Sequence, residues 1–289
     1  MPLRIAKDNN FLKGMYRFDL PNYKCQAEVC IGATELCKKY CYGNSVFRHS
    51  NDRKKKMMPP EKSAIDNYNL SLRDDFVEQM NKLIKRNDSL SIFRIHSNGG
   101  DFYSYKYLLK LIDIINANKE IRFTAYVKNF AVLEKYMEEK REVPNNFNIL
   151  LSFYPDTYDK YAAHGGIKYI DDLFKKLLEY YKAKVYKVCS GKHIISKIKH
   201  KDPTLYICSA GTKALCKKYN LDANEFKKIF IPNQKCSDCM KCYSDTKCPP
   251  GSTIYAVLRH SGSLANWNDI LKDTNKFNIL RDMYQQNLI

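Results

Sequence analysis

The chain has 289 residues, 44% of them hydrophobic, which is enough for one large α/β domain or two smaller ones with a sizeable core. No apolar run approaches the roughly 18 residues of a membrane span, and the first residues lack a signal-peptide core, so we expect a cytoplasmic protein without a membrane partner. The net charge of +18 favours DNA or RNA as a partner, although AT-rich codons also produce lysine-rich sequences of this kind.

The first predicted elements are a strand at residues 13–20, a loop with cysteines and a long amphipathic helix at residues 61–86. Because cytosolic thiols stay reduced, clustered cysteines indicate a metal site and not disulfides. The spacing lacks the two Cys-x2-Cys knuckles of a structural zinc site, so it favours an iron–sulfur cluster, with zinc as the alternative. The four cysteines of this loop are Cys25, Cys30, Cys37 and Cys41.

Strands and helices alternate through the rest of the chain. The predicted strands cover residues 91–95, 121–128, 147–153, 184–189, 204–208 and 253–258. The predicted helices cover residues 105–115, 130–139 and 171–181, and a helical tail carries Trp267. Such alternation is typical of an α/β fold with a parallel sheet.

A short polar motif ends the strand at residues 91–95. Arg94 and His96 are followed by Gly99, Gly100 and Asp101, and two glycines allow a sharp turn or the close approach of a ligand. Parallel sheets bind ligands at the carboxyl ends of their strands, so we interpret these polar side chains as candidate site residues. The alternative is that the motif is only a turn and His96 a satisfied polar group.

A second group of cysteines lies near the C-terminus, at Cys236, Cys239, Cys242 and Cys248. The first three follow a ferredoxin-like spacing, but five residues separate the third from the last where a ferredoxin has three. We predict that this segment binds a metal, as an iron–sulfur cluster or as zinc with His260 replacing one cysteine.

The order of strand, cysteine loop, helix and a strand ending in Gly-Gly-Asp resembles the radical S-adenosylmethionine superfamily. In that superfamily three loop cysteines hold a 4Fe–4S cluster, and a Gly-Gly-Glu-like motif contacts the amino group of the cofactor. The usual Cys-x3-Cys-x2-Cys pattern is absent here, and Asn44 stands where its third cysteine would follow, so a cluster would recruit Cys25 or Cys30.

This resemblance implies a fold and a set of roles. We expect a partial (β/α) barrel with parallel strands over residues 1–230, including the N-terminal cysteine loop, and a cysteine-rich metal-binding segment packed on it over residues 231–289. The implied catalytic residues are Asp101, His96, Arg94 and Lys128. The implied cofactor-binding residues are Gly99, Gly100, Asp101, Tyr126 and Ser152.

A second resemblance is to the phage gene product 88 family. Its motifs are similar to Cys41-Tyr42-Gly43, to the segment from Arg94 to Phe102, to Tyr126-Val127-Lys128 and to the C-terminal cysteines, over roughly residues 25 to 250. The resemblance implies a phage protein that is located in the cytoplasm of an infected host. It implies no settled activity.

The hypothesis from these patterns is an iron–sulfur, radical-SAM-like enzyme with one or two 4Fe–4S clusters, S-adenosylmethionine and an electron donor, acting on a nucleic acid, a nucleobase or another substrate. One alternative is a zinc-containing base-exchange enzyme similar to the tRNA-guanine transglycosylases. The other is a non-enzymatic nucleic-acid-binding protein with metals as structural staples, which the net charge of +18 favours.

Overall fold

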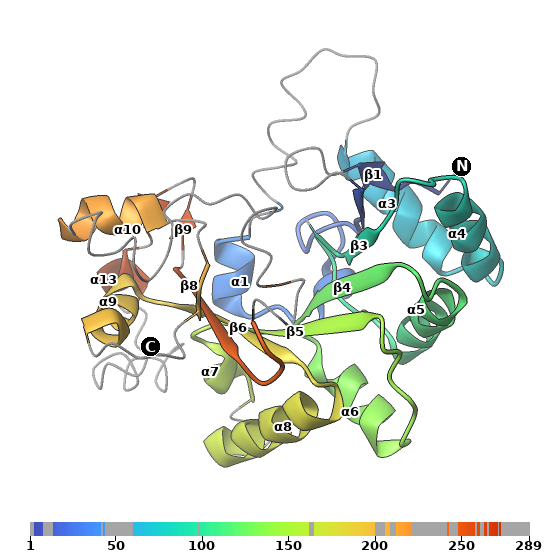
Figure 1. Ribbon diagram of the computed structural model, residues 1–289. Helices are drawn as coiled ribbons and strands as arrows, with labels where there is room; N and C mark the ends of the chain where they lie inside the picture. Colours follow the sequence, from blue (N-terminus) through green and yellow to red (C-terminus); the bar gives the residue numbers. More distant parts are fainter. Residues whose placement is uncertain are drawn as a thin grey trace, which may run out of the picture. The chain divides into compact units, whose positions relative to one another are not determined.

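The protein divides into two compact units (Figure 1). The first contains Met1–Ala33 and Cys41–Leu151, and the second contains Thr34–Tyr40 and Ser152–Ile289. The predicted domain boundary at residue 231 falls in a stretch that is not described, so it stays a prediction. The computed structural model describes residues 3–7, 14–41, 43, 60–97, 99–161, 165–199, 206–208, 212–220, 242, 248–257, 259–260, 263–264, 266–270 and 272.

The first unit is built on a mostly parallel sheet. Its strands are β1 (Ala6–Lys7), β2 (Met15–Phe18), β3 (Ile92–Ile95), β4 (Arg122–Val127) and β5 (Phe147–Phe153), whose last two residues belong to the second unit. The strands are neighbours in that order, with β1 antiparallel to β2 and all other pairs parallel. The helices are α3 (Pro60–Ser71), α4 (Phe76–Lys85), α5 (Tyr105–Ala117) and α6 (Phe130–Glu138), after a short 3-10 helix at Ala27–Cys30. The predicted α/β class with parallel strands is confirmed.

One face of this sheet is apolar and carries the helices. Registered positions of neighbouring parallel strands share a face, so Phe18, Ile95 and Ala125 lie side by side. The ring centroid of Phe18 lies 5.9 Å from that of Phe76 in α4. Helix α4 packs on α5 and α5 on α6 (Figure 1). Burial of these side chains is the main favourable term that holds the helices on this face.

The long helix expected at residues 61–86 is instead two helices, α3 and α4, so that prediction is wrong in this respect. The break lies at residues 72–75, although apolar residues continue at helical spacing through it. Leu72, which the pattern assigned to the apolar stripe, is exposed. Spacing alone therefore did not show where the helix ends.

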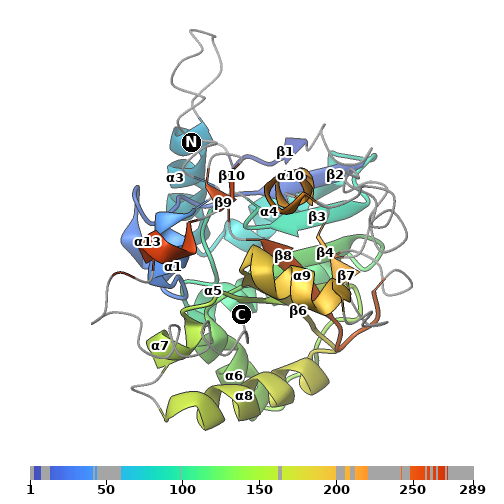
Figure 2. The same ribbon diagram turned by 90° about the vertical axis from the view of Figure 1, so that its left-hand side faces the viewer.

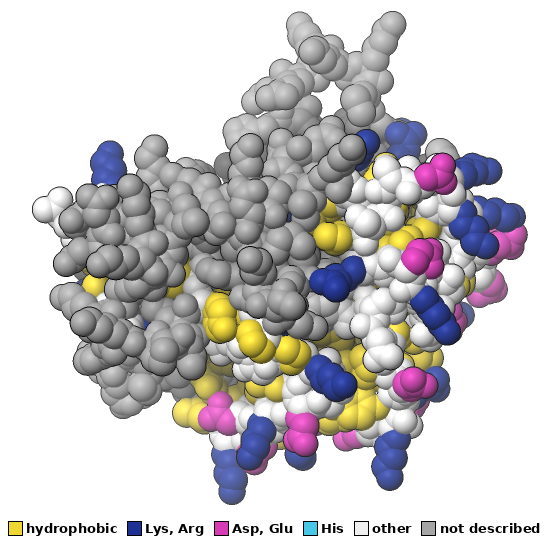
Figure 3. Space-filling view, viewed as in Figure 1, with side chains coloured by type: hydrophobic (Ala, Val, Ile, Leu, Met, Phe, Trp, Pro, Cys, Tyr) yellow, Lys and Arg dark blue, Asp and Glu magenta, His cyan; other side chains and the backbone are white. Residues whose placement is uncertain are grey.

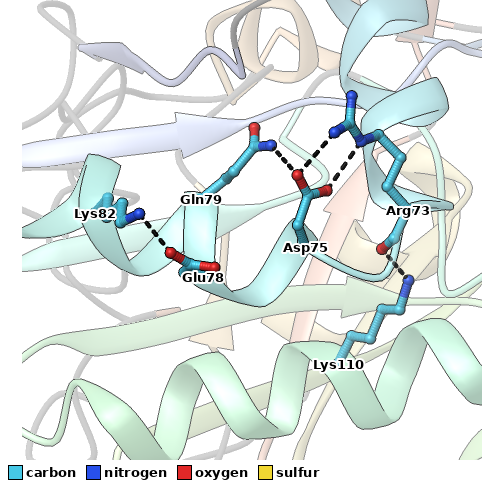
Figure 4. Close-up of polar contacts among 6 residues, drawn as sticks. All are labelled: Arg73, Asp75, Glu78, Gln79, Lys82 and Lys110. Carbon is cyan, nitrogen blue, oxygen red and sulfur yellow. Dashed lines mark hydrogen bonds and ion pairs between the residues drawn. The ribbon is translucent and has the colours of Figure 1, made fainter.

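One side chain from α5 and a set of local polar contacts explain the break (Figure 4). Lys110 of α5 donates through Nζ to the carbonyl oxygen of Arg73 at 2.6 Å, as drawn in Figure 4. It also donates to the carbonyl oxygens of Ser71 and Leu72, at 3.0 and 3.2 Å. The carbonyl of Ser71 is the last of α3 and, like the last carbonyls of any helix, has no partner within it, and the other two follow directly. Asp75 then precedes α4, and its carboxylate accepts hydrogen bonds from the guanidinium of Arg73 and from Gln79.

The second unit has a different strand order. Its strands β6 (Lys184–Cys189), β8 (Thr253–Val257) and β7 (Tyr206–Ile207) are parallel, and β8 lies between the other two. In a (β/α) barrel consecutive strands are neighbours, so this part of the chain departs from barrel order. A separate hairpin joins β9 (Arg259–His260) to β10 (Ser263–Leu264).

The second unit also contains helices and a small apolar core. The helices are α1 (Glu35–Lys39), α7 (Thr157–Tyr161), α8 (Gly166–Tyr180), α9 (Gly191–Lys199), α10 (Thr212–Tyr219) and α13 (Trp267–Ile270). Helix α9 packs on β8 (Figure 2). The core contains Cys189, Ile194, Ile195, Ile207 and Leu215. Within the described residues of both units, no helix has the length and apolar character needed to cross a membrane.

Candidate functional site

A buried carboxylate joins the ends of β3 and β4. Asp101 is 2% exposed, and its Oδ1 accepts a hydrogen bond from the backbone N–H of Phe102 at 2.8 Å. Its Oδ2 accepts from the backbone N–H groups of Lys128 and Asn129, at 3.0 and 2.8 Å. Asn129 precedes α6 and donates from Nδ2 to the carbonyl oxygen of Phe102 at 2.7 Å. Asp101 therefore locks two loops together at the N-terminus of α6, where a negative charge is favourable.

The environment of Asp101 acts on its pKa in two directions. Burial raises the pKa of this carboxyl, while the charge of Lys128 and the three backbone N–H groups lower it, and the balance is a raised pKa. Both oxygens are already engaged by the backbone. Asp101 is thus a positioning residue in this structure, and the contact with a cofactor that the sequence suggested stays a prediction.

The N-terminal cysteine loop lies against this carboxylate at Gly32. A Cβ atom at this position would come within 2.5 Å of Asp101 Oδ2 and still closer to the backbone of Lys128 and Asn129. No side chain fits in that space, so glycine permits the contact. The cysteine loop, the Gly-Gly-Asp motif and the end of β4 therefore meet at one point of the first unit.

The two glycines of the motif face the segment that leads into the cysteine loop. Gly100 has φ +85, which favours glycine, and a Cβ there would lie 2.6 Å from the side chain of Leu20. A Cβ on Gly99 would lie 2.6 Å from the carbonyl oxygen of Leu20. The following Asn22 is buried and accepts at Oδ1 from the backbone N–H of Lys24 at 3.0 Å. The close approach that the glycines allow is to the chain itself, so their cofactor role stays a prediction.

His96 is a buried imidazole among aromatic rings. Its φ is +59, an uncommon value for a residue with a side chain. Nε2 lies 2.9 Å from the hydroxyl of Tyr107, and the ring stacks on Tyr107 and meets the edge of Phe102. Burial, and then the charge of Lys128, lowers the pKa of His96 to about 3, so the ring is neutral near pH 7. Nδ1 is buried, with no hydrogen-bond partner in the described part of the chain.

The other predicted site residues lie close to the strand ends. Lys128 is half-buried directly after β4, and its charge acts on both His96 and Asp101. Arg94 and Tyr126 are half-buried. By strand alternation both lie on the sheet face opposite Phe18 and Ile95. Ser152 is buried in β5 and belongs to the second unit.

The N-terminal cysteines are distributed over both units. Cys25, Cys30 and Cys41 belong to the first unit and are half-buried, whereas Cys37 is buried in α1 of the second unit. None of the four forms a disulfide within the described part of the chain. Thiolates are the donors that iron–sulfur clusters and zinc prefer. The residues described here include no group of three or more His, Cys, Asp or Glu that could hold a metal ion.

The C-terminal metal prediction falls largely outside the described residues. Cys236 and Cys239 lie outside the described residues, whereas Cys242 and Cys248 lie within them. Cys242 acts electrostatically on Tyr186, whose hydroxyl donates to the Sγ of Cys208 at 3.5 Å. Both predicted metal sites stay predictions.

A second buried carboxylate was missed in the sequence. Asp156 is 2% exposed, three residues beyond β5, and its Oδ2 accepts from the backbone N–H of Leu36 at 2.8 Å. The side chain of Thr34, the N-cap residue of α1, also contributes a hydrogen bond. Asp156 thus holds the helix that contains Cys37. The available signal was a carboxylate shortly after a strongly predicted strand, at residues 147–153.

Comparison with known proteins identifies the family. Neither the curated proteins nor the solved structures include a match to this chain. These comparisons give no support to the radical S-adenosylmethionine resemblance. The family model described as gene product 88 matches residues 4–245, which is most of the chain and includes the motifs that meet at Asp101. The chain therefore belongs to the gene product 88 family.

Proposed function

We propose that the protein is an enzyme whose reaction centre lies at the carboxyl ends of β2, β3 and β4, and that it is of the iron–sulfur, radical-SAM-like type. The observation that carries this proposal is the contact of Gly32 with Asp101 and the backbone of Lys128. Ligands of parallel α/β sheets bind at this edge, and the contact brings the cysteine loop to it. The strand order from β2 to β5 with helices on one face also supports a partial (β/α) barrel in the first unit.

The metal part of this proposal concerns the thiols of the loop. Cys25, Cys30 and Cys41 of the first unit would hold the cluster. Their donor chemistry fits a 4Fe–4S cluster, but metal binding would have to draw the three of them together. A bound cluster would supply the electron that cleaves the sulfonium bond of S-adenosylmethionine.

Three residues of the chain then bind and orient ligands. Lys128 and Arg94 supply positive charge for a carboxylate of the cofactor or substrate. The Nδ1 of His96 has no hydrogen-bond partner among the described residues. The ring is neutral near pH 7, so Nδ1 would form a hydrogen bond with a ligand without bringing a positive charge to it. Asp101 positions the loops around them. A zinc-containing base-exchange enzyme would use the same strand edge.

The test is metal and sulfide analysis of protein purified without oxygen. About four irons with equal sulfide per chain would indicate one cluster, and about eight would indicate that the C-terminal cysteines hold a second. A Cys25→Ser, Cys30→Ser, Cys41→Ser triple variant should lose the first cluster, and Cys189→Ser, which changes a buried core thiol, should keep it. Zinc without sulfide would overturn the redox mechanism and favour the base-exchange enzyme.

Cofactor binding is a separate test on the same preparation. Equilibrium dialysis with S-adenosylmethionine should show saturable binding that Lys128→Met weakens at least about tenfold, because the substitution removes a charge-assisted contact. Glu139→Gln, on an exposed side chain paired with Arg141, is a surface control. Unchanged binding in the Lys128 variant would contradict its role.

Nucleic-acid binding is the second candidate, and the observation that favours it is the net charge of +18. In the described part of Figure 3, however, Lys and Arg side chains are interspersed with Asp and Glu over the first unit. Exposed pairs such as Arg141 with Glu139 and Lys106 with Asp74 partly neutralise that surface. Binding of DNA or RNA by metal-free protein, with affinity falling steeply as salt rises, would favour this candidate.

A further inference from the structure

A lysine interrupts an apolar row on one strand of the second unit. In β6 the alternate positions Val185, Lys187 and Cys189 share one face, and Val185 and Cys189 are buried. Lys187 is half-buried and in register with Tyr255 of β8, which packs against the small core that contains Cys189. Lysine is rarely placed in such surroundings without a partner for its charge.

The ammonium group of Lys187 forms neither a hydrogen bond nor an ion pair with any described residue. Nζ lies 5.7 Å from the ring centroid of Phe153, close to the limit of about 6 Å for a cation–π interaction. Phe153 in turn meets Tyr158 and Phe174 edge to face, with ring centroids 5.0 and 5.1 Å away. The amine thus lies beside an aromatic cluster. Its nitrogen is not one of the fully buried polar atoms that lack a partner, so it is not sealed from solvent.

The surroundings of Lys187 favour the neutral form of its amine. Burial has the largest effect on the pKa of Lys187 and lowers it, and the positive charge of Lys197 in α9 lowers it further. Ionised Cys189 would raise it, but burial brings the pKa of that thiol to about 12, so the thiol is neutral near pH 7. Asp171 also raises it, but this carboxylate is exposed, is screened by solvent and already accepts a hydrogen bond from the hydroxyl of Tyr158 at 2.8 Å. The balance is a lowered pKa.

A neutral primary amine is a nucleophile, and lysines in desolvated sites beside a second cation form imines with carbonyl compounds. We propose that Lys187 binds the carbonyl group of a small aldehyde as an imine, and that the neighbouring charge of Lys197 activates it. The nitrogen lone pair attacks the carbonyl carbon, and the carbonyl oxygen leaves as water with the two protons of the amine. The C=N bond that forms requires no metal, oxidant or reductant.

This site goes beyond the proposed function. Lys187, Lys197 and Phe153 all belong to the second unit, and none of them takes part in the site at Asp101. Imine formation needs neither the cysteine loop nor S-adenosylmethionine. A metal-free chain that forms the imine would keep this site and lose the radical mechanism, and an iron–sulfur protein with an unreactive Lys187 would do the reverse.

The experiment is reductive alkylation of the full-length wild-type protein with glycolaldehyde and cyanoborohydride at pH 7, followed by peptide mass spectrometry. Cyanoborohydride transfers a hydride to the imine carbon and leaves a stable secondary amine on each lysine that has reacted. Lys187 should be labelled at least about tenfold faster than Lys175 and Lys182, which are exposed in the same unit, because each unit of lowered pKa raises the neutral fraction about tenfold. In urea-denatured protein the three lysines should react at equal rates, since the difference depends on the fold.

Two matched variants test the part of Lys197. Lys197→Met should slow the labelling of Lys187 about threefold or more and move its pH profile upward, because the loss of the neighbouring charge leaves more of the amine protonated. Lys175→Met removes the same charge from the exposed surface of α8 and should leave the rate unchanged. Equal rates in Lys197→Met and wild type would show that the neighbouring charge does not activate the amine.

The main comparison is made within wild-type protein, so it does not depend on the folding of a variant. Labelling of Lys187 no faster than that of Lys175 and Lys182 in folded protein would overturn the proposal. A preference for Lys187 that persists in urea would overturn it as well, because the reactivity would then come from the local sequence and not from the site.

Discussion

Two buried aspartates hold different parts of the same cysteine loop, one in each unit. Asp101 follows β3 and contacts the loop at Gly32, whereas Asp156 follows β5 and binds the N-terminus of α1 just beyond it. Asp101 accepts three backbone N–H groups over both oxygens. Asp156 has a buried Oδ1 with no hydrogen-bond partner among the described residues. A buried carboxylate therefore anchors the loop at two points. Only the first of them, Asp101, belongs to a motif that can be recognised in the sequence.

The comparison also changes the interpretation of the Gly-Gly-Asp motif. The two glycines lie against Leu20, which leads into the cysteine loop, and Asp101 lies against Gly32 within that loop. Asp156 performs the corresponding anchoring without any glycine pair beside it. A motif selected for its similarity to a cofactor site thus has a structural role in this chain, whatever it binds in addition.

The largest effect is expected from Gly32→Ala, which places a methyl group against backbone on both sides of the first anchor. We expect a loss of about 3 kcal/mol in the free energy of unfolding, because backbone cannot move aside as a flexible side chain can. Urea denaturation measures it. Gly251→Ala is the control, since a Cβ there meets no atom within 4 Å and costs only the strain of φ +80, about 1 kcal/mol. Equal losses would show that the contact at Gly32 is loose.

Replacing each aspartate with alanine should show which of the two anchors contributes more to the free energy of unfolding. Asp101→Ala leaves three buried N–H groups without an acceptor and should cost about 2–3 kcal/mol. Asp156→Ala removes an acceptor from one backbone N–H and a partner from Thr34, and should cost about 1–2 kcal/mol. Denaturation curves of both variants under the same conditions give the difference. A larger loss in Asp156→Ala would reverse the ranking.

A fall in pH should reduce the contribution of His96 to the stability of the fold, whereas a rise in pH should reduce the contribution of Asp156. The pKa of His96 is lowered from 6.5 to about 3 in the folded protein, so its contribution to stability is present above pH 6.5 and lost as the pH falls below it. Burial raises the pKa of Asp156 from 3.8, so its contribution is present below pH 3.8 and lost as the pH rises through the folded value.

Denaturation midpoints across the acid range would test this. His96→Gln should flatten the decline of stability below pH 6.5, and Asp156→Asn should remove a decline that begins above pH 3.8. If wild type and His96→Gln had the same pH profile, the imidazole would not be buried as described.

The smallest effect concerns the cap of α1. Thr34 accepts a hydrogen bond from the backbone N–H of Cys37 and contacts Asp156, so Thr34→Ala should cost about 1 kcal/mol, and Thr34→Ser should restore most of it. Ser104→Ala removes the corresponding cap of α5, away from the cysteine loop. Only the Thr34 variant should also change the alkylation rate of Cys37. Equal alkylation rates in both cap variants would show that the cap does not control access to that thiol.

Much of the strand pattern could be predicted from local sequence. Strands β5 and β6 have the expected bounds, and β3 and β4 start one residue late, because runs of β-branched and aromatic residues between turn residues determine such strands locally. Helices α9 and α10 were not predicted. The break between α3 and α4 depends on Lys110, which is distant in the sequence and has no signature at residues 72–75.

The candidate site was predictable only in part. Arg94, His96 and Asp101 were found because they flank a strand end. Asp156 was not, although it follows a strongly predicted strand, because its role depends on the backbone N–H of Leu36, which lies 120 residues away in the sequence. The left-handed backbone of His96, which accompanies its stacking on Tyr107, also had no sequence signal.

The position of Gly32 has a consequence for synthesis of the chain. Its contacts are made with Asp101, Lys128 and Asn129, all of which leave the ribosome long after the cysteine loop does. Cys25 and Cys30 are therefore expected to emerge without their anchor and to remain open to oxidation or to passing metal ions until β4 is complete. If the loop binds a metal as proposed, delivery of that metal is expected to follow folding of the first unit.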